Sequence, residues 1–167
     1  GWERSALTQC SVFAGGFGAI EAEYAFRIGR DAPADKFEWT PAQAADYVGS
    51  AHAAIEIASS PLATINQLGP CVIIADFGNN AGLILGAEIP DGLFRADDTF
   101  NCRMELDGVV VGTGGAASLP GGPLGALAFA LGRCARRGLP LKAGMLVTTG
   151  AATGIHNIRA GQSALAG

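Results

Sequence analysis

The stretch from Ile20 to Ile28 carries an apolar side chain at every second position. Positions 20, 22, 24, 26 and 28 are all apolar, and side chains two residues apart point to the same face of a strand. The pattern therefore predicts a strand with one continuous apolar face. Glu21 and Glu23 lie side by side on its opposite face.

Two neighbouring carboxylates on one face repel each other, and burying both without a partner costs on the order of several kcal/mol. A divalent cation removes that cost, and carboxylate oxygens suit Mg²⁺, Mn²⁺ or Ca²⁺. The alternative is a half-exposed strand whose glutamates are solvated, which is the usual meaning of such alternation. This stretch alone leaves both interpretations open.

A third acid follows in the short, β-branched run at residues 53–59, which Pro61 ends. If this run is a strand, Ile55 and Ile57 share one face and Glu56 occupies the other. Glu56 is then either a charge on an edge strand or a buried ligand. The run itself favours neither.

The remaining pattern predicts two helices and a hairpin. Thr40 can cap a helix together with Gln43, which predicts a helix from there to about residue 51. An apolar stripe at three- and four-residue spacing predicts a second helix that starts at Pro123 and stops at Gly138. A turn at Asp107-Gly108 between two apolar runs predicts a hairpin over 101–111.

Further strands are expected at 83–85 and 145–149, and residues 87–98 are expected to form a surface loop. The apolar run 71–75 is too short for its type to be settled by periodicity. Because strands, isolated helices and glycine-rich loops follow one another without βαβ alternation, the sequence predicts an α+β, mostly β fold.

Composition narrows the class of protein. The 167 residues suffice for one domain with a substantial core, and 49% hydrophobic against 16% charged residues excludes disorder. A net charge of −4 argues against nucleic acid and anionic membranes as partners. His52 and His156 are isolated and are interpreted as structural or solvated. The four cysteines are widely scattered and are expected to be reduced thiols of a cytoplasmic protein; they are Cys10, Cys71, Cys102 and Cys134.

Five blocks of residues occur in an order and approximate spacing that is similar to one known family. Together they resemble the 2-keto-4-pentenoate hydratase and 4-oxalocrotonate decarboxylase branch of the fumarylacetoacetate hydrolase superfamily, over residues 18–162. The blocks are Ile20-Glu21-Ala22-Glu23, Ala54-Ile55-Glu56-Ile57, Ala75-Asp76 with Asn79-Asn80, Gly121-Gly122-Pro123-Leu124, and Leu141-Lys142-Ala143-Gly144 through Thr149-Gly150.

The resemblance implies a Mg²⁺ or Mn²⁺ site made by Glu21, Glu23 and Glu56. It also implies a mixed β-sheet roll with two main helices, like the C-terminal domain of that superfamily. The implied activity is hydration of 2-hydroxy-2,4-dienoates from the meta-cleavage of aromatic rings. Alternatives are decarboxylation of a 2-oxo-3-enedioate, hydrolytic carbon–carbon cleavage of an acylpyruvate, which a glutamate at position 56 disfavours, and a non-catalytic fragment or subunit.

Further residues and partners follow from the resemblance. The family has an additional N-terminal region that supplies a lysine for acid/base steps, so residues 1–167 are expected to form one metal-binding domain without that region and without the last C-terminal strand. Homo-oligomers, or a complex with a paralogous hydratase or decarboxylase, are expected. Substrate contacts are expected at six residues for which turn or cap chemistry is the alternative: Asn79, Asn80, Gly121, Gly122, Thr149 and Gly150.

Overall fold

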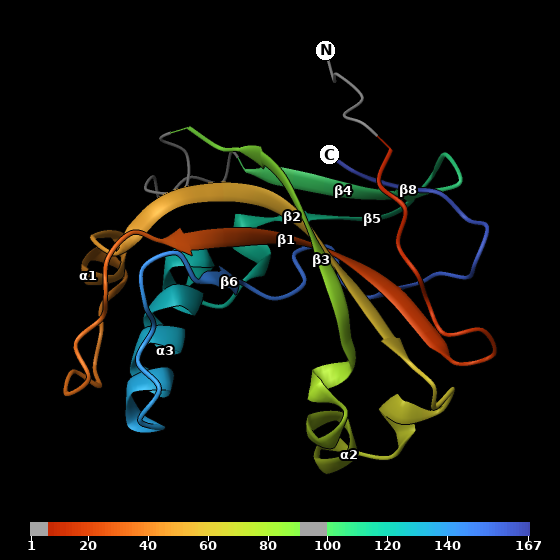
Figure 1. Ribbon diagram of the computed structural model, residues 1–167. Coiled ribbons are helices and arrows are strands. Elements are labelled where there is room, and N and C mark those ends of the chain that lie inside the picture. The colour runs from red at the N-terminus through yellow and green to blue at the C-terminus, as the bar shows by residue number, and fades with distance from the viewer. Residues whose placement is uncertain (1–6, 91–99) are drawn as a thin grey trace.

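The computed structural model describes residues 7–90 and 100–167, which form two antiparallel sheets and three α-helices (Figure 1). In chain order the elements are β1 (Phe17–Ile28), α1 (Pro41–Ala45), β2 (Val48–Ser60), α2 (Pro70–Ala75), β3 (Asn80–Glu88), β4 (Asn101–Leu106), β5 (Val109–Gly115), α3 (Gly122–Arg136), β6 (Leu146–Thr148), β7 (His156–Asn157) and β8 (Ala164–Ala166).

The larger sheet has the strand order β3-β2-β1-β6, and β7 pairs with β1 as well. The smaller sheet has the order β5-β4-β8. In Figure 1, β1 and β2 are long curved strands. The C-terminal part of β1 packs against α3, and its N-terminal part packs against β4 of the smaller sheet. The apolar face of β1 therefore meets two different layers along its length.

Both α3 and the smaller sheet pack against the apolar residues of β1 that the sequence pattern predicted. Phe26 and Ile28 pack in one cluster with Leu127 and Leu131 of α3. Ile20 and Ala22 pack in a second cluster with Met104 of β4. The apolar face predicted for β1 is therefore the centre of the hydrophobic core, and the opposite face is left to the glutamates.

The predicted α+β, mostly β fold is confirmed, with one difference in detail. The family resemblance implied a mixed sheet, whereas all recorded pairings between described strands are antiparallel. Of the two helices that the sequence predicted, the structure confirms the second and shortens the first.

The first predicted helix is wrong beyond Ala45. Its start is as expected, because Thr40 and Gln43 form a capping box and Pro41 occupies the first turn. The chain then enters β2 at Val48, and Ser50 pairs with Arg27 of β1. Ladder bonds to β1 and burial of Ala51 thus decide the conformation of residues 48–51, where Val48 and Gly49 have low helix propensity in any case.

The second helix and the hairpin are confirmed. Pro123 lies in the first turn of α3, and Gly138 follows it with a positive φ of 73°. Asp107 and Gly108 both have positive φ in the turn between β4 and β5. The undecided run 71–75 belongs to α2, which has no buried residue.

Two further expectations concern the C-terminal half. The family's last C-terminal strand was expected to be missing, and this stays a prediction; after Gly161, Ala164–Ala166 form β8, whose backbone pairs with the edge of β4. The expected loop 87–98 begins later, since β3 runs to Glu88, and residues 91–99 lie outside the described part. No helix among the described residues is long and apolar enough to cross a membrane.

Candidate metal centre

Two adjacent strands bring the three predicted acids together. Glu21 of β1 lies directly opposite Glu56 of β2, and Glu23 lies opposite Ala54. Since residues two apart share a face, all three carboxylates project from the same side of the sheet. Carboxylate oxygens of the three glutamates lie within 4.8 Å of one another.

Burial changes the protonation of these acids. The side of the sheet that carries them leaves Glu23 only 5% exposed. Burial, and to a smaller extent the neighbouring Glu56 carboxyl, raise the pKa of Glu23 to about 7, although hydrogen bonds from the Gly150 N–H and the Thr148 hydroxyl act in the opposite direction. Burial, followed by repulsion from Glu56, also raises the pKa of Glu21. The cluster therefore holds negative charge with difficulty unless a cation is present.

Two N–H donors hold two of the carboxylates. The backbone N–H of Gly150 donates to Glu23 Oε2 at 2.8 Å. The side-chain amide of Asn80, at the start of β3, donates to Glu56 Oε1 at 2.5 Å. These contacts place Asn80 and Gly150, both predicted as substrate contacts, at the glutamates themselves.

The threonine that faces the acids is Thr148, which the sequence reasoning missed. Thr148 lies opposite Ala25 in the β1–β6 pair, so its side chain shares the face of Glu23. The predicted Thr149 instead accepts a hydrogen bond from the Tyr24 N–H through Oγ1, at 3.2 Å. Only the register of β6 distinguishes these neighbours, and the sequence gives no signal for that register.

The other three predicted substrate contacts are Asn79, Gly121 and Gly122, and none of them has a hydrogen bond to one of the three glutamates in the described part of the chain. Asn79 has a positive φ of 52°, and its amide donates to Asn66 Oδ1 at 3.3 Å. Gly121 and Gly122 have positive φ in the turn before α3, and α3 packs on the apolar face of β1. These three residues have turn conformations, and their role as substrate contacts stays a prediction.

The two histidines also have local partners. His52 contacts the Ser50 hydroxyl at 2.9 Å and the Gly86 carbonyl oxygen at 3.2 Å. His156 contacts the Thr153 hydroxyl at 3.2 Å.

The donor set fits a divalent cation. Every candidate ligand atom is a carboxylate oxygen, which suits hard ions such as Mg²⁺, Mn²⁺ and Ca²⁺. The raised pKa of Glu23 means that its ionised form is unfavourable in the buried position, and a bound cation would stabilise that form. The solvated-glutamate alternative is disfavoured at Glu23, because that side chain is almost fully enclosed.

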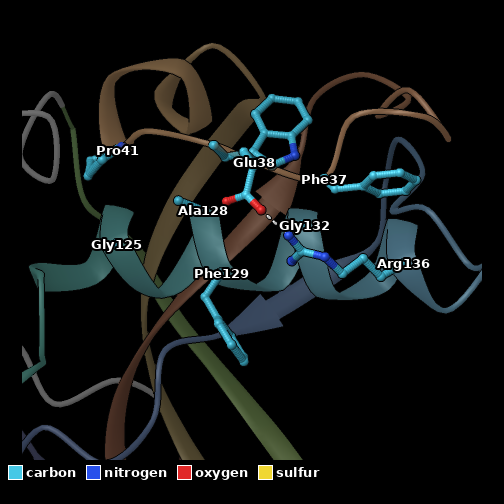
Figure 2. Close-up of a pocket in the computed structure, with 9 residues that line it drawn as sticks. Phe37, Glu38, Pro41, Gly125, Ala128, Phe129, Gly132 and Arg136 are labelled. Atoms are coloured by element: carbon cyan, nitrogen blue, oxygen red, sulfur yellow. Dashed lines mark hydrogen bonds and ion pairs between the residues drawn. The ribbon is translucent and has the colours of Figure 1, made fainter.

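A separate groove of about 290 Å³ lies between residues 37–41 and the outer face of α3 (Figure 2). Phe37 and Gly132 line it, and Figure 2 shows Glu38 reaching across to Arg136, with which it forms an ion pair. The groove contains none of the predicted site residues, and both members of its ion pair are solvent-exposed. The three glutamates are the stronger candidate, because the burial of Glu23 beside two other carboxylates demands a compensating charge.

Known proteins resemble this chain in sequence and in fold. It is 36% identical over 134 residues to a 2-keto-4-pentenoate hydratase from Burkholderia vietnamiensis, across 79% of this chain and 49% of that protein. The chain spans about half the length of the curated relatives it matches. No protein-family model matches it.

Two solved structures share the fold. A 4-oxalocrotonate decarboxylase from Pseudomonas putida G7, complexed with magnesium and adipate, superposes with a TM-score of 0.76 at 22% identity, covering 90% of this chain and 56% of that one. A fumarylpyruvate hydrolase from Pseudomonas aeruginosa, in complex with Mn²⁺ and pyruvate, gives a TM-score of 0.65 at 16% identity, covering 91% and 61%. Both contain a divalent metal ion.

Proposed function

Because the chain belongs to the hydratase and decarboxylase branch of the fumarylacetoacetate hydrolase superfamily, we propose that it is a divalent-metal-dependent hydratase of 2-hydroxy-2,4-dienoates. Glu21, Glu23 and Glu56 are the proposed ligands of a Mg²⁺ or Mn²⁺ ion. The reaction belongs to the degradation of aromatic rings by meta-cleavage.

One observation carries this proposal: three carboxylates from two paired strands converge within 4.8 Å on one face of the sheet, with Glu23 buried and Glu21 and Glu56 partly buried. An arrangement with such mutual repulsion is stable only if protons or a cation compensate the charge. The names of the sequence relatives supply the substrate class, and the carboxylate cluster supplies the kind of chemistry.

A divalent ion at this position supplies Lewis-acid chemistry, since it offsets negative charge that develops on the oxygens of a bound 2-oxo or 2-hydroxy acid. The chain itself supplies orientation. The Gly150 N–H and the Asn80 amide hold Glu23 and Glu56 in place. The strand end at Thr149-Gly150 remains the proposed contact for the substrate carboxylate.

The acid/base group of the reaction is proposed to lie outside the residues considered so far. Neither His52 nor His156 contacts the glutamates in its recorded hydrogen bonds. The family resemblance implies that a lysine from an N-terminal region of the family takes this role. Homo-oligomers, or a complex with a paralogous enzyme, remain the proposed assembly.

Decarboxylation of a six-carbon unsaturated 2-oxo diacid is the second candidate. The specific observation in its favour is that the decarboxylase structure with the same fold holds adipate, a six-carbon diacid, together with magnesium. Hydration and decarboxylation both require stabilisation of the negative charge that develops on the substrate oxygen bonded to C2, beside the C1 carboxylate. The same three glutamates would therefore serve either reaction.

Product analysis by mass spectrometry tests the proposal. The purified protein is incubated with a five-carbon 2-hydroxy-2,4-dienoate or with a six-carbon unsaturated 2-oxo diacid, each with Mg²⁺ or with a chelator. We expect metal-dependent gain of water by the dienoate. Metal-dependent loss of carbon dioxide from the diacid would move the protein to the second candidate.

Glu23→Gln is the matched variant, because it keeps the size of the side chain and removes its charge. We expect this variant to lose both Mg²⁺ binding and turnover. Turnover that is unchanged by chelator and by the substitution would contradict the metal-dependent mechanism. Mg²⁺ binding without turnover of either substrate would favour the non-catalytic alternative.

A further inference from the structure

We propose that Asn80 is a positioning residue that restricts Glu56 to one ligand oxygen and thereby biases the three-glutamate site toward Mg²⁺ over Ca²⁺. This inference rests on the proposed metal site and goes beyond it, because it assigns the choice of ion to a residue that is not itself a ligand. It also replaces the substrate-binding role that the sequence predicted for Asn80.

A local irregularity of the sheet turns Asn80 toward the acids. In the β2–β3 pair, Ile57 lies opposite Gly82 but Ala58 lies opposite Asn80, so Ala81 is an extra residue. Without this bulge, Ala81 would face Ala58, and the Asn80 side chain would project from the other face of the sheet. The bulge therefore places the Asn80 amide on the same face as Glu56.

The amide then occupies one side of the Glu56 carboxylate. Its Nδ2 donates to Oε1 at 2.5 Å, and this N–H group competes with a cation for the lone pairs of that oxygen. Oε2 is therefore the Glu56 oxygen that we assign to an ion. The Gly150 N–H acts in the same way on Glu23 Oε2, at 2.8 Å.

Restricting two carboxylates to one oxygen each limits how many ligands the protein can provide. Mg²⁺ prefers a strict octahedral shell that retains several waters, whereas Ca²⁺ accepts about 6–8 oxygens and readily takes bidentate carboxylates. A site whose acids cannot turn to bind through both oxygens is therefore better matched to the smaller ion. Removing the Asn80 amide frees Glu56 to rotate and to add a ligand for Ca²⁺.

Calorimetric titration of the metal-free protein with Mg²⁺ and, separately, with Ca²⁺ tests this inference. For Asn80→Ala we expect the ratio of the two dissociation constants to shift in favour of Ca²⁺ by about ten-fold, the lower range for loss of a residue that supports a metal ligand. Asn79→Ala is the control, because the neighbouring amide donates to Asn66 and not to a glutamate. It should leave the ratio unchanged.

Asn80→Leu provides a second test that does not depend on the alanine variant folding. It keeps the approximate size and branching of the side chain but removes the N–H donor without adding a charge, so the ratio should again shift toward Ca²⁺. An unchanged ratio in either folded Asn80 variant would overturn the inference, as would an equal shift in Asn79→Ala. If the wild-type protein bound neither ion, the proposed metal site itself would fail.

Discussion

The twelve residues of β1 alternate between two faces, and burial has opposite effects on the free energy of the side chains on each face. On one face, Phe26 is fully buried against α3 and gains stability by leaving water. On the other face, Glu23 is almost as well buried, and its raised pKa records the cost of removing a carboxylate from water. The difference separates a face that stabilises the fold from a face on which burial is costly, and the second face is the one proposed to bind the metal ion.

Truncation on the apolar face should have the largest effect. Phe26→Ala removes a fully buried ring from the cluster that joins β1 to α3, so we expect a loss of about 3–5 kcal/mol in unfolding free energy. Urea unfolding measures this loss. The expected effect is independent of pH and of Mg²⁺, and an effect that appeared only with metal present would break the division between the two faces.

The glutamate face should instead produce a dependence of stability on pH. The folded-state pKa of Glu23 is about 7, above its ordinary value of 4.5, so the folded metal-free protein binds a proton more tightly than the unfolded chain does. Stability is then highest below pH 4.5 as far as this group is concerned, and it falls as the pH rises toward 7 and beyond. After allowance for solvent screening, we expect a loss of about 2 kcal/mol.

Comparison with Glu23→Gln isolates this contribution from that of other acids. The metal-free variant should lack the loss and should be the more stable protein above pH 7. Urea unfolding in chelator at a series of pH values measures the difference. Parallel curves for the two proteins would mean that burial of Glu23 carries no electrostatic cost.

A smaller effect is expected at the threonine pair. Thr148→Val removes a hydroxyl that stabilises ionised Glu23, so the metal-free protein should lose about 1 kcal/mol above pH 7 and almost nothing at low pH. Thr149→Val is the matched control, because it removes an acceptor for the Tyr24 N–H and should destabilise the protein equally at all pH values. A pH-independent loss in both variants would remove Thr148 from the glutamate face.

Local patterns predicted the elements whose neighbours lie close along the chain. Alternation found β1, the Asp107-Gly108 turn found the hairpin, and the apolar stripe found α3. The stretch after Ala45 was wrongly predicted as helix because its conformation is decided by pairing with β1, about 20 residues earlier in sequence. The all-antiparallel pairing likewise depends on contacts that no single stretch contains.

The candidate site shows the same division. Alternation placed Glu21 and Glu23 on one face, but their meeting with Glu56 depends on the β1–β2 register. The choice between Thr148 and Thr149 depends on the register of β6, and the orientation of Asn80 depends on the extra residue Ala81. These features arise from strand alignment, which residue type alone does not encode.

The direct pairing of Glu21 with Glu56 also has a consequence for how the chain folds. A slip of one residue between β1 and β2 would carry Glu56 to the apolar side of the sheet and separate it from the other two acids. Misaligned hairpin-like intermediates could not assemble the three carboxylates. A metal ion that binds during refolding would therefore stabilise only those chains in which β1 and β2 are correctly aligned.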